Sequence, residues 1–349
     1  MEKTIKRAYI CKDIEKFEIN TGLLQNYRPI DGDVGIFEVV KIGKHKSIQS
    51  HTKRNSTIIP GDYFMAAFGT RYATAQFEGY LPESINTELH ILGAGGTVGV
   101  IESMHYNFLD IGPTTLRCIG MAVDNDNKVI NTRAIHQHNM IPFRGAAANA
   151  TSVILSLGSS MDSGKTTSAS YLVHGLKEAG YRVAFVKLTG TVYTKDCDLA
   201  LDLGAEMTAD FSDFGFPSTY LCSEQELLNL YESLLVKVMQ CHPDFVIMEI
   251  ADGLYERETK MLLQNVHFKN SVDAVLFSAG DSLAAVNGIQ LLDSWGIHPF
   301  AISGLLTASP LLIKEVRENC NMEVLTIDQL SQKEIIHHIH KFEKKLMSN

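Results

Sequence analysis

The hydrophobic positions of the chain follow two different patterns, and the change comes near residue 145. Before it, apolar runs of strand length alternate with turn residues, as in "VGIFEVVKIG" (34–43), "GDYFMAAFG" (61–69) and "TELHILGAGG" (87–96). Such closely spaced runs, with few long amphipathic stretches, predict a β-rich domain over residues 1–145, in the form of a small barrel. Within it, "DNDNK" (124–128) predicts a hairpin turn.

After residue 145, apolar runs alternate with amphipathic helical stretches. The run "SVILSLG" (152–158) has strand length, and the apolar residues of 169–176 recur at i, i+3, i+4 and i+7, which predicts a helix ending at Gly180. Further strands are predicted at 181–188, 243–251, 272–279, 297–304 and 322–327, and further helices at 223–240, 282–296, 309–319 and 331–346. This alternation predicts an α/β domain over residues 146–349, with a parallel sheet covered by helices.

Composition limits the classes of function. The 349 residues are 45% hydrophobic and 20% charged, which is typical of folded domains, and the net charge of −9 argues against nucleic-acid binding. The six cysteines are scattered without a C-x-x-C pair, as in a protein with reduced thiols. No apolar run approaches the roughly 18 residues of a membrane span, and the first twenty residues carry charges throughout. We therefore expect a cytoplasmic protein with no membrane partner.

The stretch "GSSMDSGKTT" (158–167) lies between the first strand and the first helix of the predicted α/β domain. Small residues there allow backbone N–H groups to surround a phosphate, aided by the helix N-terminus. A lysine can then contact the β- and γ-phosphates, and a hydroxyl can bind Mg²⁺. A plain Gly/Ser-rich turn is the alternative. The expected nucleotide-binding residues are Gly158, Ser159, Ser160, Met161, Asp162, Ser163, Gly164, Lys165, Thr166 and Thr167.

The first glycine of this stretch comes one position earlier than in the usual G-x-x-x-x-G-K-[ST] pattern. The resulting spacing resembles the "GTD-x-x-VGKT" loop of dethiobiotin synthetase and its relatives in the MinD/BioD class of P-loop NTPases. The matching positions are Gly158, Asp162, Gly164, Lys165 and Thr166, whereas Ser160 replaces the aspartate of that family.

Three later segments are similar to segments of the same family, so the resemblance spans about residues 150–330. They are "AGYRVAFVKLTGT" (179–191), "DCDLALDLGA" (196–205) and "PDFVIMEIADG" (243–253). The resemblance implies that Lys165 and Lys187 are catalytic and that Thr166, Asp198 and Glu249 bind Mg²⁺.

Simpler roles remain open for these residues from the sequence alone. Lys187 is also consistent with a surface lysine at a strand end, Asp198 with a helix cap, and Glu249 with a buried carboxylate without a metal. The neighbouring Asp196 is expected to be solvated, and Asp252 to cap the helix that follows it.

The resemblance implies an ATP- and Mg²⁺-dependent ligase or synthetase that phosphorylates a carboxylate or similar group of a small molecule, and that forms a homodimer. The sequence departs from the family at Leu188, at "EIADG" (249–253) and at 305–307, where relatives place a base-reading asparagine. The resemblance implies ATP, and these departures leave GTP as the alternative and the substrate open.

Two other functions stay open. The segments "KLTGT" (187–191) and "ADFSDFG" (209–215) are also similar to a P-loop family that includes a D-glutamate N-acyltransferase, which implies an acyltransferase. The third candidate is a nucleotide-dependent switch or accessory ATPase, in which the β-rich domain binds a partner.

Overall fold

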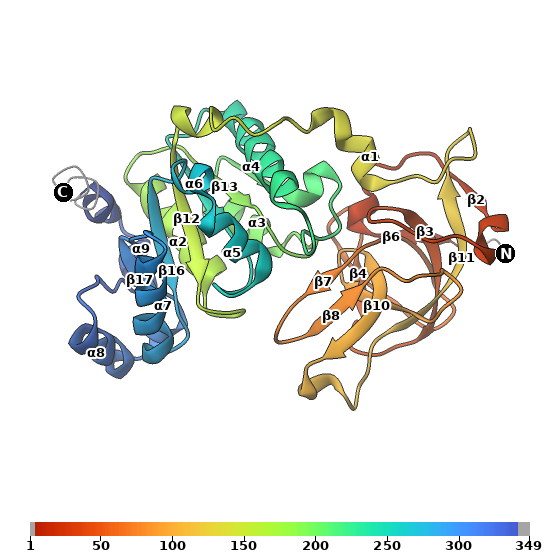
Figure 1. Cartoon of the computed structure of the whole chain (residues 1–349), viewed down its shortest axis with the longest axis horizontal. Coiled ribbons are helices and arrows are strands. Elements are labelled where there is room, and N and C mark those ends of the chain that lie inside the picture. Colours follow the sequence, from red (N-terminus) through yellow and green to blue (C-terminus); the bar gives the residue numbers. More distant parts are fainter. Residues whose placement is uncertain (1–3, 341–349) are drawn as a thin grey trace. The chain divides into compact units, whose positions relative to one another are not determined.

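The computed structural model describes residues 4–340 of the chain, which forms two compact units (Figure 1). The first unit comprises Met1–Met140, Gly190–Thr194 and Phe211–Leu221. The second unit comprises Ile141–Thr189, Lys195–Asp210 and Cys222–Asn349. Residues 190–194 and 211–221 fall within the predicted α/β domain (146–349), whereas in the structure they are part of the first unit.

The first unit is built from short strands and one short helix. They are β1 (Ile5–Arg7), β2 (Glu18–Asn20), β3 (Val34–Lys41), β4 (Ser47–Gln49), β5 (Asn55–Thr57), β6 (Tyr63–Phe68), β7 (Arg71–Tyr72), β8 (Phe77–Tyr80), β9 (Leu89–Gly93), β10 (Thr97–Met104), β11 (Thr115–Val123) and α1 (Thr132–His136). Strands β6, β3, β11, β9 and β10 pair in that order, and β10 pairs again with β6. The ring of strands is therefore closed, in agreement with the predicted small barrel.

Alternate residues of the barrel strands point inward and form the hydrophobic core of the ring. Phe64, Ala66 and Phe68 of β6 belong to one buried cluster because alternate residues of a strand face the same side. The hairpin predicted at 124–128 is also present, since Val123 bridges Val129 and Asn127 takes the left-handed conformation with φ of 61°.

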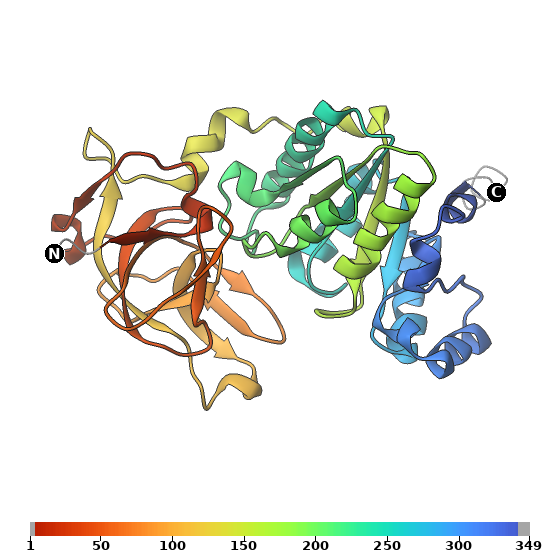
Figure 2. The same ribbon diagram turned by 180° about the vertical axis from the view of Figure 1, so that it is seen from behind.

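The second unit is an α/β sandwich. Its strands are β12 (Ser152–Gly158), β13 (Val183–Lys187), β14 (Met207–Asp210), β15 (Phe245–Glu249), β16 (Ala274–Ser278) and β17 (Ala301–Ser303). Its helices are α2 (Lys165–Glu178), α3 (Lys195–Asp202), α4 (Glu224–Val238), α5 (Arg257–Gln264), α6 (Val266–Lys269), α7 (Ser282–Ser294), α8 (Pro310–Asn319) and α9 (Ile327–Leu330). Figure 2 shows the same elements from behind.

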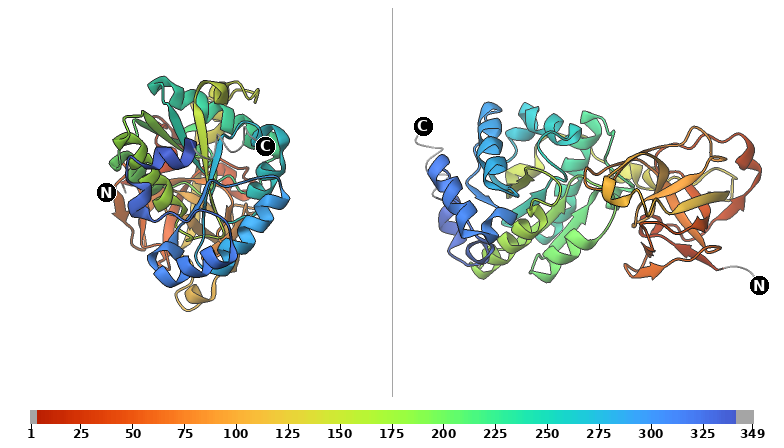
Figure 3. Two further views of the ribbon diagram at one scale, coloured as in Figure 1. Left: turned by 90° about the vertical axis from the view of Figure 1, so that its left-hand side faces the viewer. Right: turned by 90° about the horizontal axis from the view of Figure 1, so that it is seen from below.

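The six strands are parallel, in the order β14-β13-β15-β12-β16-β17. Consecutive residues of β12, such as Ile154 and Leu155, are both buried, which requires cover on both faces of the sheet. Helices lie on both sides of it in the left-hand view of Figure 3. The predicted parallel α/β fold is confirmed, and it places the carboxyl ends of β12, β13 and β15 side by side.

Two local predictions were wrong or incomplete. Residues 322–327 form no strand: Val324 makes one isolated bridge to Ile302, and Thr326 caps α9 through a capping box with Gln329. The short strand β14 and helix α3 were not predicted. The helix predicted at 331–346 is present over 335–340, and its remainder lies outside the described residues. None of the helices in residues 4–340 is long and apolar enough to cross a membrane.

Glu232 of α4 fixes the segment that leads into β12. Its carboxylate is 3% exposed and accepts hydrogen bonds from the backbone N–H groups of Gly145, Ala146 and Ala147 at 3.0–3.2 Å. Glu232→Ala would remove three hydrogen bonds from partly exposed backbone donors, and a typical hydrogen bond contributes about 0.5–1.5 kcal/mol. We expect the free energy of unfolding to fall by about 3 kcal/mol.

Urea denaturation followed by the fluorescence of the single tryptophan, Trp295, measures this change in the second unit. Glu178→Ala, on an exposed turn of α2, is the matched control. A loss no larger than that of the control would contradict the role given to Glu232.

Candidate functional site

The loop between β12 and α2, residues 158–167, has the compact geometry that its small residues predict; we call it the GKT loop. Gly164 is the N-cap of α2 and has φ of +94°, a conformation that favours glycine. At Gly158 an added Cβ would lie 2.3 Å from Ser163 Oγ and 2.6 Å from Lys165 Cδ. The loop therefore encloses the aliphatic part of Lys165 and directs the first N–H groups of α2 toward its own concave side.

Lys165 is buried, with 6% of its surface exposed, and its Nζ donates to the carbonyl oxygen of Ser160 at 2.8 Å. Burial lowers the pKa of this ammonium group, while the nearby carboxylates of Glu249 and Asp252 act in the opposite direction. One carbonyl uses one of the three donors of an ammonium group. Lys165 can therefore bind an additional anionic oxygen without leaving the loop.

Glu249, at the end of β15, is the centre of a polar cluster beside the GKT loop. It is 2% exposed, and its Oε1 accepts from Thr166 Oγ1 at 3.1 Å and lies 3.4 Å from Lys187 Nζ. Lys187 also forms an ion pair with Asp196. The structure thus brings together Lys165, Thr166, Lys187 and Glu249, which the sequence analysis had selected separately.

Several polar atoms at this cluster have no hydrogen-bond partner among the described residues. They are Oε2 of Glu249 and the hydroxyls of Ser159, Ser163 and Ser278. Ser278 lies beside the loop, because its carbonyl accepts from the N–H of Ser159 at 2.9 Å. Buried polar atoms are rarely left without partners, so their concentration here is what a binding site for a polar ligand would show.

The donor set fits Mg²⁺. Thr166 Oγ1 and Glu249 supply adjacent oxygen atoms, and Mg²⁺ in phosphate-binding sites takes one or two protein oxygens and fills its other positions with water and phosphate. No cluster of three or more His, Cys, Asp or Glu side chains suited to a metal occurs in residues 4–340. A site at Thr166 and Glu249 therefore depends on the ligand to complete it.

Asp196 differs from the expectation, whereas that for Asp198 is not tested. Asp196, which we expected to be solvated, is the residue that pairs with Lys187, and Asp198 is half-buried two residues further along α3. Residues two apart on a helix point in different directions. The sequence offered no signal to distinguish them, and the metal role of Asp198 stays a prediction.

The segment after β15 also differs from the expectation. Helix α5 is capped by Glu256, whose carboxylate accepts from Thr259 N at 2.7 Å, and not by Asp252. Asp252 instead has φ of 57°, and Gly253 packs so closely on the GKT loop that an added Cβ would lie 2.6 Å from the carbonyl oxygen of Ser159. This segment thus supports the GKT loop from the β15 side.

Glu256 gives the second unit a measurable pH dependence. Burial, reinforced by a hydrogen bond with Glu258, raises the pKa of Glu256 from 4.5 to about 8. Because the folded-state pKa is the higher one, the protonated carboxyl stabilises the fold below pH 4.5, and this contribution is lost as the pH rises through about 8. Glu256→Gln, which is neutral at every pH, should flatten the pH profile between these values.

The profile is measured as the urea midpoint of Trp295 fluorescence from pH 5 to 9, with Glu178→Gln as the exposed control. A wild-type profile that rises with pH, or a Glu256→Gln profile as steep as the wild type, would contradict this assignment.

A cavity of about 310 Å³ adjoins the GKT loop. It is lined by residues at the start of α2 (Gly164, Thr167), after β17 (within 304–308) and at the start of α9 (326–328). Gly164, Thr167 and 305–307 were noted from the sequence, whereas 326–328 were not, because the start of α9 was predicted as a strand.

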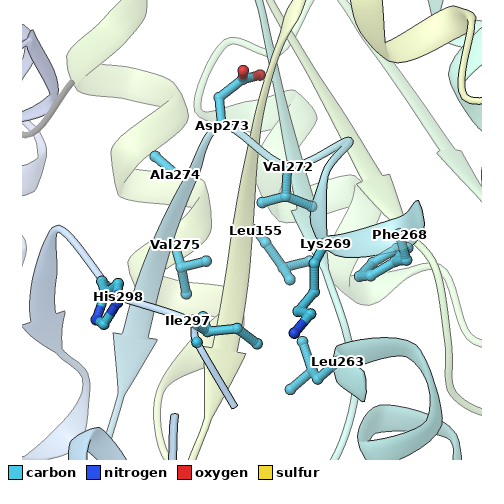
Figure 4. Close-up of a pocket in the computed structure, with 11 residues that line it drawn as sticks. Leu155, Leu263, Phe268, Lys269, Val272, Asp273, Ala274, Val275, Ile297 and His298 are labelled. Atoms are coloured by element: carbon cyan, nitrogen blue, oxygen red, sulfur yellow. The ribbon is translucent and has the colours of Figure 1, made fainter. Parts of the chain in front are cut away.

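A smaller cavity of about 140 Å³ lies at the amino ends of β12 and β16 (Figure 4). Its polar groups already have partners: Lys269 Nζ donates to the Trp295 carbonyl at 2.7 Å, and Asp273 accepts from Val153 N at 2.7 Å. Ligands of parallel sheets bind at the carboxyl ends of the strands, so the GKT loop and the larger cavity form the candidate site.

The chain matches no protein-family model and no curated protein. Among solved structures it is similar to the signal recognition particle 54 kDa protein of Aeropyrum pernix K1 in complex with GDP, with 18% identity over 57% of this chain and 49% of that chain, and a TM-score of 0.38. It is also similar to FtsY of Mycoplasma mycoides, with 13% identity over 59% of this chain and 70% of that chain, and a TM-score of 0.36. The aligned region spans about half the length of the first of these proteins. Similarity at this level carries no function from either protein to this chain.

Proposed function

We propose that the second unit is a P-loop nucleotide-binding domain, and that the protein uses Mg²⁺ and a nucleoside triphosphate for phosphoryl transfer. The observation that carries this proposal is the buried Oε2 of Glu249, without a partner among the described residues, beside Thr166 and Lys187 at the mouth of the GKT loop. A buried carboxylate is costly unless it is paired or binds a metal. A magnesium-bound nucleotide would satisfy it.

Each residue has a role that follows from its position. The N–H groups of the GKT loop and Lys165 would hold the β- and γ-phosphates, and Thr166 and Glu249 would hold Mg²⁺, which neutralises charge on the phosphates. Lys187, oriented by Asp196 and Glu249, would attract the acceptor oxygen. In the transfer, the bond between the γ-phosphorus and the bridging oxygen breaks and a bond to the acceptor oxygen forms.

The acceptor is the finer part of the proposal. The resemblance to dethiobiotin synthetase suggests a carboxylate of a small molecule, and an ammonium group such as that of Lys187 suits a carboxylate. Asp198 as a further metal ligand and a homodimer both stay predictions.

Release of nucleoside diphosphate from ATP and from GTP, with Mg²⁺ and with excess EDTA, tests the proposal. We expect turnover that requires Mg²⁺ and that rises when the acceptor acid is present in a panel of small carboxylic acids. Absence of both nucleotide binding and turnover would refute the proposed function.

One observation favours a nucleotide-dependent switch as a second candidate. Residues 190–194 follow Lys187 within a few positions, yet they belong to the first unit, where the Gln49 side chain bonds the N–H and Oγ1 of Thr194 at 3.1 and 2.7 Å. A shift of Lys187 on nucleotide binding would be passed to the barrel through residues 188–194, which are continuous with it in the chain. Hydrogen exchange in 190–194 should then differ between di- and triphosphate states, whereas equal exchange would remove this candidate.

A further inference from the structure

We infer that the cavity beside the GKT loop binds the base of the nucleotide and that Asp328 selects guanine over adenine. The inference rests on the proposed function and deepens it, because the sequence analysis expected ATP and left GTP as the alternative.

The position of the cavity suits a base whose phosphates lie in the GKT loop. The segment after β17 packs directly on that loop: Leu305 N donates to the Ser163 carbonyl at 3.0 Å, and an added Cβ on Gly304 would lie 2.4 Å from the same oxygen. The cavity begins at Gly164 and Thr167, in the first turn of α2. Its 310 Å³ lies at the small end of the roughly 300–1,000 Å³ range of ligand pockets.

The cavity offers apolar surface for a flat ring. Leu305 is 61% exposed although it is a large apolar residue, and it lines the cavity together with Ile327. An exposed leucine alone needs no explanation, but two apolar side chains lining a cavity beside the GKT loop can pack against the faces of a purine.

Besides the hydroxyls of Thr167, Thr307 and Thr326, the cavity has one charged hydrogen-bond acceptor. Thr307 Oγ1 donates to the Gly304 carbonyl at 2.8 Å, and Thr326 Oγ1 accepts from Gln329 N at 3.3 Å. Asp328 is the one charged side chain among the described residues that line the cavity, and its carboxylate is exposed, with no side-chain partner in residues 4–340. The cavity thus presents two carboxylate oxygens and no cationic side chain.

A carboxylate distinguishes the two purines. Guanine presents two adjacent donors, N1–H and the 2-amino group, which match the two oxygens of a carboxylate in a bidentate, charge-assisted pair. Adenine presents the lone pair of N1 at the same edge, which a carboxylate repels. Bidentate pairs of this kind commonly give about 10- to 100-fold discrimination against the wrong base.

The test measures dissociation constants of GDP, IDP and ADP with Mg²⁺ by calorimetry, for the full-length wild type and for Asp328→Asn. IDP has the N1–H but lacks the 2-amino group. We expect the wild type to bind GDP about 10- to 100-fold more tightly than ADP, with IDP between them. In Asp328→Asn the amide N–H₂ faces the 2-amino group of guanine, so GDP should lose its advantage over IDP. ADP should bind as tightly as in the wild type or more tightly, because the carboxylate that repels adenine N1 is gone. Asp202→Asn, exposed on α3, is the matched control.

Equal binding of GDP and ADP by the wild type, or an unchanged GDP/IDP ratio in Asp328→Asn, would overturn the inference and leave the proposed function standing. Failure of the wild type to bind any of the three nucleotides would overturn the proposed function itself. ADP binding that is retained or tighter in the variant would exclude misfolding as the cause of a lost preference.

Discussion

Lys165→Ala should lower nucleotide turnover by at least about 100-fold, the usual cost of removing one preorganised donor from a developing negative charge. The ammonium group of Lys165 is held inside the GKT loop by the Ser160 carbonyl, so it is already in place when the phosphates arrive. No other lysine in the described structure has its side chain enclosed by this loop, and water cannot supply the same fixed charge.

The same substitution should leave the fold intact. Burial lowers the pKa of Lys165, so the charged side chain costs free energy in the absence of a ligand, and its removal should not destabilise the second unit. Turnover and urea denaturation are measured on the same preparations, with Lys314→Ala on the exposed face of α8 as the control. Turnover within a fewfold of the wild type would show that Lys165 does not contact the reacting phosphates.

Glu249→Gln should separate metal binding from phosphate binding. The amide keeps the shape of the side chain and an oxygen for Thr166, but it removes the negative charge that would hold Mg²⁺. We expect Mg²⁺-dependent turnover to fall by about 100-fold or more. In EDTA, nucleotide affinity should be unchanged or tighter, because a carboxylate no longer lies beside the phosphates.

A purely structural defect would weaken both Mg²⁺-dependent turnover and nucleotide affinity in EDTA, so the loss of turnover alone identifies a role in metal binding. The measurement is nucleotide affinity by calorimetry and turnover over a range of Mg²⁺ concentrations, with Glu318→Gln, exposed on α8, as the control. A variant with the Mg²⁺ dependence of the wild type would remove Glu249 from the proposed metal site.

The parts of the site that the sequence predicted are those determined by local rules. A buried strand followed by small residues and a helix requires the loop geometry found at Gly158 and Gly164, and parallel strands bring Lys187 and Glu249 to one edge of the sheet. Because these constraints act within one strand–loop–helix unit or between adjacent strands, they are visible in the pattern of apolar and small residues.

The parts that the sequence did not predict depend on long-range packing. The pairing of β10 with both β9 and β6 joins segments distant in the sequence, and residues 211–221 belong to the first unit although the residues before and after them belong to the second. The pairing of Asp196 with Lys187 depends on which way one turn of α3 faces, and composition gives no information about this. The short strand β14 has too few apolar residues to show a pattern.

The most direct measurement of the central claim is calorimetric titration of the full-length protein with a non-hydrolysable nucleoside triphosphate, with and without Mg²⁺. If the GKT loop binds the phosphates and Glu249 helps to bind the metal, one nucleotide will bind per chain, Mg²⁺ will tighten binding about 10-fold or more, and Lys165→Ala will abolish it. Binding that is indifferent to Lys165→Ala, or no binding of any triphosphate, would contradict the account.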